Sequence, residues 1–472
     1  MNNRIKFYIG ILLALTNFIF FSCSDNYPKS KEEPYATDLL SIKIINAGAE
    51  GNTIVDGTID EENKMVSFPR LDTLTDFSAI NVDAKVSEGA KITQSVFDFS
   101  MSEEESFKTL ILRVINQNRY KDYFIKVRKN IPVFGADFEK PIIYNFSGDS
   151  IYTSFKSLLT RGTAFDGKYV LIVSRGSLGP HLLKVSDLEK GTILPIKLDL
   201  TGITGGTYLY NQGALSGGHI FLASLAGSKA TPLKIYFWDT PSSSPKLIAD
   251  IDLSSIVGSG TRYGDNMSVD LDTTGNGYIY FGDNASQTIL RLKVSSYKTV
   301  SSPTLIKSNS NATAFMNINL VTESKQYIWS GVRTQIMLTD EVGNVKYTMQ
   351  QGSIADESID PRIFTFNQER YLLVCTAGLG SASTATPSLY IYNITKGSSV
   401  EDALREFDQS SNHNADFSFS LGGMGNSAPS AQTGYYIKKD KAGNDSILYV
   451  FGARTDSGFA ICKFPIKQQN DN

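Results

Sequence analysis

Apolar runs recur in pairs from about residue 133 onward, and a polar loop separates the two members of each pair. The first members, most of them led by an aromatic residue, span 169–173, 219–223, 278–281, 327–330, 371–375 and 448–451. Their partners span 182–185, 233–238, 289–294, 336–338, 389–392 and 460–464. Short runs flank most pairs, so roughly four strands recur every ~40 to 50 residues, which predicts the blades of a β-propeller.

Closure of such a ring lets each twisted sheet cover the next, because one four-stranded sheet does not bury both of its faces alone. We expect six or seven blades over 131–468, with 142–146 lending a strand that closes the ring. A short helix is expected at 401–407 and a glycine-rich crossing at 422–431. A run of separate sandwiches is the competing architecture.

Residues 37–130 carry seven shorter β-rich runs with turn residues between them. In the run 123–128, the period of two places Ile125 and Val127 on one face and Lys126 and Arg128 on the other. This pattern predicts an N-terminal Ig-like β-sandwich, without the Cys…Trp…Cys pattern of antibody domains. The predicted fold class is therefore all-β, with a sandwich followed by a propeller, and 469–472 form a disordered tail.

The N-terminus has the pattern of an export signal. Arg4 and Lys6 precede an apolar run over 7–21, and Ser22 and Cys23 follow it. The run is shorter than the roughly 20 residues that a permanent membrane helix needs, so we expect cleavage. The predicted organisation is a signal peptide over 1–22 and a flexible tether over 23–36.

These features resemble those of Bacteroides-type surface lipoproteins, a family of uncharacterised function. The resemblance rests on the Ser22-Cys23 junction, on the polar stretch that begins at Ser24, and on the Ser-Glu-Gly-Ala turn within 86–92. It implies that Cys23 is lipidated and that the mature protein is anchored in the outer membrane, with the cell surface as the expected side. A plain secretory signal is the alternative. The genes of such lipoproteins often accompany glycan-uptake systems, which implies a glycan or protein ligand.

Charge and residue counts narrow the function. The 45 Lys and Arg against 48 Asp and Glu give a net charge of −3, which argues against a nucleic-acid partner. Only 3 histidines are present, and HExxH, G-x-S-x-G and P-loop motifs are missing. A non-catalytic role is therefore favoured. Cys375 and Cys462 lie in apolar runs and are expected to be buried thiols or a disulfide.

Aromatic and polar side chains in the loops and strand ends are the candidate ligand-binding residues. Aromatic rings stack on the apolar faces of sugars, and neighbouring amide, carboxylate and guanidinium groups bind hydroxyls. The candidates are Tyr208, Tyr210, Trp238, Arg262, Tyr263 and Trp329.

One segment resembles a calcium loop. Asp270 and Asp272 occupy loop positions one and three, and Gly275 occupies position six. Position twelve is Phe281 where a calcium loop has a bidentate Glu, so a hairpin turn is the simpler interpretation. No cofactor is expected, apart from a structural Ca²⁺ if this loop binds one.

The sequence therefore predicts a lipid-anchored cell-envelope binding protein that presents one propeller face to an extracellular polysaccharide. Two alternatives remain at this stage. One is a glycan-degrading propeller enzyme that uses converged carboxylates such as Asp356, Glu357 and Asp360. The other is a structural or adhesive partner in an envelope protein complex, which predicts a large exposed apolar patch.

Overall fold

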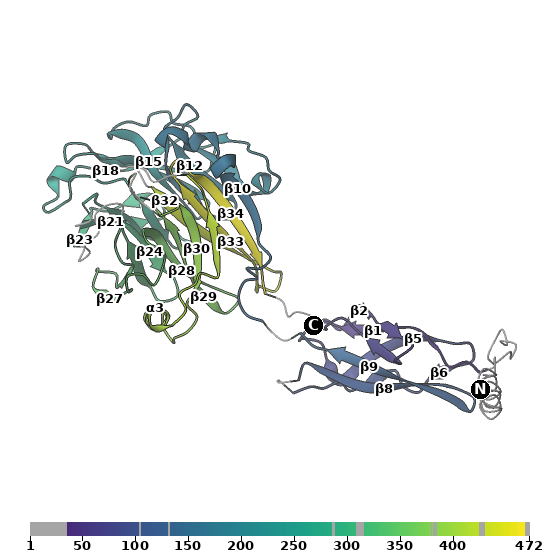
Figure 1. Cartoon of the computed structure of the whole chain (residues 1–472). Helices are drawn as coiled ribbons and strands as arrows, with labels where there is room; N and C mark the ends of the chain where they lie inside the picture. Colours follow the sequence, from purple (N-terminus) through teal and green to yellow (C-terminus); the bar gives the residue numbers. More distant parts are fainter. Residues whose placement is uncertain are drawn as a thin grey trace, which may run out of the picture. The chain divides into compact units, whose positions relative to one another are not determined.

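The computed structural model describes residues 35–102, 105–130, 133–285, 288–307, 316–378, 380, 385–423 and 430–467. The predicted signal peptide, the predicted lipidation site Cys23, most of the predicted tether, most of the expected crossing at 422–431 and the expected tail at 469–472 lie outside the described residues. The chain divides into two compact units, Met1–Pro132 and Val133–Asn472 (Figure 1). Both units are built of β-strands, and no helix among the described residues is long and apolar enough to cross a membrane.

Unit 1 contains two sheets around one apolar core. The first sheet has the order β2 (Thr53–Asp56), β1 (Leu39–Ala47), β5 (Ile80–Val86) and β7 (Val96–Phe97). The second has the order β3 (Thr58–Asp60), β4 (Met65–Ser67), β9 (Arg119–Arg128), β8 (Phe107–Asn116) and β6 (Lys91–Ile92). Ile125 and Val127 are fully buried in this core, as the alternation predicted.

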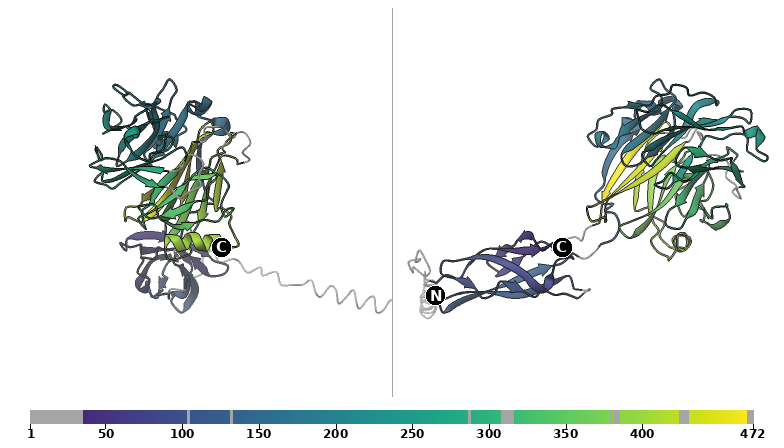
Figure 2. Two further views of the ribbon diagram at one scale, coloured as in Figure 1. Left: turned by 90° about the vertical axis from the view of Figure 1, so that its left-hand side faces the viewer. Right: turned by 180° about the vertical axis from the view of Figure 1, so that it is seen from behind.

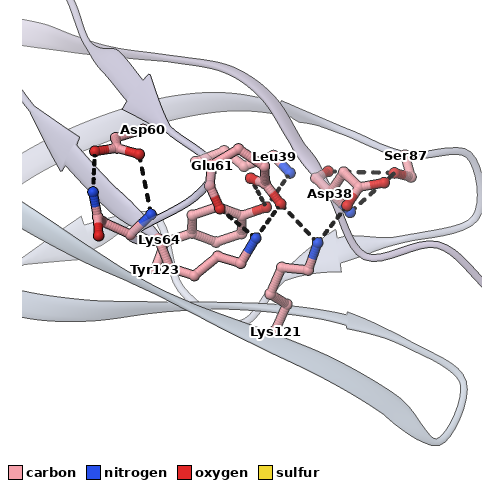
Figure 3. Close-up of polar contacts among 9 residues, drawn as sticks. Asp38, Leu39, Asp60, Glu61, Lys64, Ser87, Lys121 and Tyr123 are labelled. Atoms are coloured by element: carbon pink, nitrogen blue, oxygen red, sulfur yellow. Dashed lines mark hydrogen bonds and ion pairs between the residues drawn. The ribbon is translucent and has the colours of Figure 1, made fainter. Parts of the chain in front are cut away.

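A polar network ties three segments of unit 1 together (Figure 3). Glu61, which follows β3, accepts hydrogen bonds from Lys64 Nζ at 2.6 Å, Lys121 Nζ at 2.9 Å and Tyr123 Oη at 2.8 Å. Tyr123 Oη in turn accepts the backbone N–H of Leu39 at 3.0 Å. Partial burial raises the pKa of Glu61, but these three donors outweigh it and hold the pKa at about 2.

Unit 2 consists of six antiparallel sheets that follow one another along the chain. The strands of the first three are β11 (Thr160–Phe165), β12 (Tyr169–Ser174), β13 (His181–Lys184) and β14 (Ile196–Lys197); β15 (Tyr208–Ser216), β16 (His219–Leu225), β17 (Leu233–Trp238) and β18 (Lys246–Ile251); and β19 (Ser268–Leu271), β20 (Gly277–Gly282), β21 (Thr288–Ser295), β22 (Thr299–Val300) and β23 (Thr304–Lys307).

The fourth and fifth sheets contain β24 (Asn317–Val321), β25 (Gln326–Ser330), β26 (Met337–Thr339) and β27 (Val345–Thr348), then β28 (Ser358–Phe366), β29 (Glu369–Thr376), β30 (Ser388–Asn393) and β31 (Phe417–Ser420). The last combines β10 (Ile142–Ser147) with β34 (Gly458–Pro465), β33 (Asp445–Arg454) and β32 (Ala431–Lys439), which lie side by side in Figure 1. The segment 142–146, which was expected to lend a strand that closes the ring, forms β10 and pairs with β34 at the edge of this sheet.

One edge strand from each of the six sheets takes part in a closed ring of contacts. In chain order, β11, β15, β19, β24, β28 and β32 each contact the next strand, and β32 contacts β11. The strand pairs predicted from the apolar runs all pair in register, for example β12 with β13 and β29 with β30. The predicted short helix is α3 (Val400–Gln409), seen in green in the left view of Figure 2.

Apolar clusters fill the spaces between successive sheets, so the inner strands are buried on both faces. This explains continuous buried runs such as β12, in which five of the six residues are buried and no alternation is visible. Cys375 and Cys462 lie in one such cluster as free thiols, and burial raises the pKa of each to about 12. They contribute apolar packing rather than reactivity.

Candidate functional site

Three arginines line one pocket of unit 2, which we call the arginine pocket. Its volume is about 450 Å³, and its lining consists of Arg161, Arg175, Thr207, Tyr208, Leu225, Gly227, Ser228 and Arg262. These residues come from the start of β11, the end of β12, the start of β15, the end of β16 and the loop before β19. Because neighbouring strands are antiparallel, the points in β11, β12, β15 and β16 lie at the same edge of two adjacent sheets. The backbone bridge between Ala226 and Tyr263 joins the loop before β19 to this edge.

Arg262 is held by its loop. Tyr263 forms an isolated bridge with Ala226, through hydrogen bonds of 2.9 and 3.1 Å between the two backbones. Gly264 follows with a φ of +100°, and a Cβ there would lie 2.3 Å from the carbonyl oxygen of Ser224, so only glycine fits. Asp265 then accepts Arg262 Nε at 2.6 Å and Nη2 at 2.8 Å, a bidentate pair that fixes the guanidinium plane.

Arg175 and Tyr208 form a stacked pair in the pocket wall. The guanidinium carbon lies 3.5 Å from the centroid of the Tyr208 ring, which is close enough for a cation–π contact. Arg175 also donates from Nη2 to Asn211 Oδ1, and Asn211 Nδ2 donates to the carbonyl of Gly264 at 2.6 Å. The loop that carries Arg262 therefore also fixes the residue that orients Arg175. Tyr208 is 45% exposed, so its ring remains accessible.

Arg161 is oriented by a strained turn. Ser157 and Leu158 have φ values of +61° and +57°, which are uncommon for residues other than glycine. Leu158 donates its backbone N–H to Asp456 Oδ1 at 2.8 Å and accepts Arg161 Nε at 3.0 Å. The turn thus ties the inner end of the Arg161 guanidinium to the backbone.

The three cations lie close enough to influence one another. Burial and, to a smaller extent, the positive charges of Arg161 and Arg262 lower the pKa of Arg175 to about 10. Burial also lowers the pKa of Arg161, whereas the hydrogen bond to Asp265 raises that of Arg262. All three side chains remain protonated at neutral pH. Among the described lining residues no carboxylate is present, so the pocket lining carries only positive charge.

Two of the six predicted ligand-binding residues, Tyr208 and Arg262, meet in this pocket. Tyr210 is half-buried and packs against the cluster between the first two sheets of unit 2. The other three are corrected by their burial: Trp238 and Tyr263 are fully buried and Trp329 is 1% exposed, so none offers a ring face to a sugar. Trp238 Nε1 donates to the carbonyl of Asp199 at 3.0 Å. Tyr263 instead positions Arg262 through the backbone bridge described above.

The segment considered as a calcium loop is a hairpin turn. Asp272 Oδ1 accepts the backbone N–H groups of Thr274 at 2.8 Å and Asn276 at 3.0 Å, as a turn-forming aspartate does. Asp270 is directed elsewhere, because Tyr327 Oη donates to its Oδ2 at 3.3 Å. The two carboxylates therefore serve separate contacts. Among the described residues, no group of three or more His, Cys, Asp or Glu side chains is arranged to hold a metal ion.

A second pocket of about 500 Å³ lies between the loop after β25 and the segment before β28. Asp356 and Glu357 are in its lining, and Arg333 Nε pairs with Glu357 Oε1 at 3.2 Å. Asp360, the third carboxylate considered for catalysis, is buried and accepts the backbone N–H of Thr433 at 2.7 Å. This carboxylate holds two sheets together and does not line the second pocket.

Arg161 and Arg175 are the site residues that sequence reasoning missed. Each stands at one end of a strand, where a cation is ordinarily solvated. The only signal was their position: Arg175 follows the buried run of β12, and Arg161 lies at the start of β11, where the pairing with β12 shifts register. Their meeting with Arg262 depends on the loop before β19, which bridges to the end of β16, and leaves no motif in the sequence.

A solved structure resembles the chain over nearly its whole length. The DUF4623 family protein from Bacteroides eggerthii DSM 20697 is 52% identical with a TM-score of 0.73, and the match covers 92% of this chain and all of that one. The alpha-L-arabinofuranosidase Arb93A of Fusarium graminearum is 9% identical, with a TM-score of 0.41 over 68% of this chain and 98% of that one. A TM-score this low carries no argument about function. No protein of curated function matches the chain.

The model of the family described as "Domain of unknown function (DUF4623)" matches residues 25–467, which include both structural units and the arginine pocket. Together with the 52% identity to the Bacteroides eggerthii protein, this match shows that the chain belongs to the DUF4623 family.

Proposed function

We propose that the protein is a lipid-anchored binding protein of the outer membrane, which holds an extracellular polysaccharide in the arginine pocket without cleaving it. The anchor part of this proposal is supported by the signal pattern that ends at Ser22 and Cys23. One lipidated cysteine followed by a polar tether fits a protein that is held to a membrane and does not span it.

The anchor is tested by replacing the cysteine in a bacterial host that processes lipoproteins. In cells labelled with a fatty acid, the wild-type chain is expected to carry the label and to fractionate with the outer membrane. Cys23→Ser is expected to lose both properties, and Cys375→Ser serves as the control because that thiol is buried in the core. Label that persists in Cys23→Ser would contradict the anchor.

The architecture that we propose is an Ig-like sandwich followed by a six-bladed propeller. Support for the propeller comes from the six sheets, each of which contributes one edge strand to a closed ring of contacts. Support for the sandwich comes from the two sheets of unit 1 that enclose one core. In this architecture unit 1 acts as the spacer from the membrane, and the edge that carries the arginine pocket is the binding face.

The observation that carries the binding proposal is the exposed ring of Tyr208 among hydrogen-bond donors. An aromatic ring beside guanidinium and hydroxyl groups suits a sugar, which presents apolar C–H faces and many oxygen acceptors. Cleavage of a glycosidic bond by the usual route requires a pair of carboxylic groups. The described lining of the arginine pocket has none, so this pocket suits retention of a glycan rather than hydrolysis.

The experiment is affinity electrophoresis of the protein through gels that contain plant, host or microbial polysaccharides. Tyr208→Ala is expected to weaken retention about tenfold, which corresponds to ~1.4 kcal/mol. Tyr436→Ala is the matched control, because Tyr436 is 41% exposed and Tyr208 is 45% exposed, and Tyr436 does not line the pocket. Equal retention of the two variants would contradict the arginine pocket as the binding site. Release of reducing sugar would show that the protein is an enzyme instead.

A further inference from the structure

We propose that the arginine pocket binds an oxyanion of its polysaccharide ligand, so that the protein selects acidic glycans, bearing uronate carboxylates or sulfate esters, over neutral ones. This inference rests on the proposed polysaccharide-binding function and adds the class of ligand to it. Three guanidinium groups, two from the first sheet of unit 2 and one from the loop before β19, gather around one open cavity.

Nearby carboxylates neutralise only part of the positive charge of the pocket. Asp265 is 7% exposed and satisfies Arg262 through two hydrogen bonds. Among the described residues, neither Arg161 nor Arg175 forms an ion pair with a carboxylate. The chain as a whole carries a net charge of −3, so this gathering of cations is local and is not a general basic surface.

Fixed guanidinium groups suit an oxyanion better than a neutral sugar. Each presents several N–H donors in one plane, which match the oxygens of a carboxylate or sulfate. Contacts through Asn211, Asp265 and the Leu158 carbonyl hold the three side chains before any ligand arrives, so little side-chain entropy is lost on binding. A bound anion also relieves the mutual repulsion of the three cations, which neutral hydroxyls do not.

The exposed Tyr208 ring places a sugar next to these donors. The Arg175 guanidinium covers one part of the ring, and 45% of the residue remains exposed. A pyranose on the accessible part would bring its carboxylate or sulfate within reach of the arginines. The pocket thus combines an aromatic platform for the sugar ring with an anion-binding site for its charged substituent. A free inorganic anion would occupy only the anion-binding site.

The test compares pairs of polymers that differ only in charge, using the full protein at physiological salt. Polygalacturonate is set against its methyl ester, and dextran sulfate against dextran. The protein is expected to bind at least one charged member about tenfold or more tightly than its neutral counterpart. The member that binds identifies the oxyanion as carboxylate or sulfate.

Variants assign the effect to the pocket. Arg161→Gln is expected to weaken binding of the charged polymer by about tenfold, and Arg161→Lys to restore part of it. Ser228→Glu, which adds a negative charge at the exposed rim without removing a buried group, is expected to weaken it at least as much. Ser242→Glu is the matched control: both serines are exposed and contact a threonine hydroxyl, at 3.1 Å for Ser228 and 3.3 Å for Ser242.

The outcomes separate this inference from the proposed function. Neutral polymers that bind as tightly as charged ones, with dependence on Tyr208 but not on Arg161, would overturn the inference and leave polysaccharide binding intact. A third outcome is that no polymer is retained, while free galacturonate stabilises the wild type but not Arg161→Gln. This outcome would contradict a polymeric ligand but support the anion site. If the protein binds single-stranded DNA and not acidic glycans, the inference that the bound anion belongs to a glycan is contradicted.

Discussion

Replacement of Trp238 by alanine is expected to lower the free energy of unfolding of unit 2 by about 3 to 5 kcal/mol, the range for removing a large buried aromatic side chain. Trp238 is the last residue of β17 and is fully buried. It packs in the cluster between the first two sheets of unit 2, with Leu182 and Ile220 among its members. Truncation leaves a cavity and removes the indole N–H that binds the Asp199 carbonyl at 3.0 Å.

Urea unfolding measures this effect. The remaining tryptophan, Trp329, lies in the same unit and reports its unfolding by fluorescence. Trp238→Phe keeps most of the apolar volume and loses the hydrogen bond, so a smaller loss of about 1 to 2 kcal/mol is expected. Wild-type stability together with lost polysaccharide retention in Trp238→Ala would contradict the buried position and restore this ring as a ligand contact.

Arg454→Met is expected to destabilise unit 2 by about 3 kcal/mol or more, because it removes a buried cation that satisfies several buried oxygen atoms. Arg454 ends β33 and is 0% exposed. It donates from Nε to the Ala377 carbonyl at 2.6 Å and from Nη2 to the Gly378 carbonyl at 3.1 Å. These bonds tie the last sheet to the loop after β29. The methionine side chain fills similar space but has no donor.

The control for Arg454→Met is Arg405→Met, which removes an arginine from the surface. Arg405 lies on α3, its side chain is 44% exposed, and it pairs with Glu401 at 2.7 Å. An exposed pair of this kind contributes little, so a change within about 1 kcal/mol is expected. The comparison uses urea midpoints followed by the fluorescence of both tryptophans. Similar losses in the two variants would mean that the burial of Arg454 contributes nothing specific to stability.

The strands were predictable because apolar runs are local properties of the chain. Each predicted pair in unit 2 is a pair of neighbouring strands, and the additional strand β10 was found from one apolar run over 142–146. The number of sheets was left at six or seven. The long interval before the last pair contains α3 rather than a further sheet, and the sequence did not distinguish these two ways of filling it.

The binding residues were harder to predict, because exposure is not a local property. Strands buried on both faces lose the alternation that marks a half-exposed strand. Trp238 and Tyr208 therefore looked equivalent as aromatic candidates, yet one is fully buried and the other is 45% exposed. Tyr263 was selected for its ring, whereas its backbone is the part that holds Arg262 in the pocket.

The sequence by itself determined the all-β composition, the strand pairs and the additional strand at 142–146, because these follow from apolar runs and the turn residues between them. Only the tertiary structure decided that Arg161, Arg175 and Arg262 share one pocket, since they lie up to about a hundred residues apart, two in the first sheet of unit 2 and one in the loop before β19. From the sequence alone, a charged residue at the end of a strand is expected to be exposed to solvent. The packing of one sheet against the next is what brings such residues together.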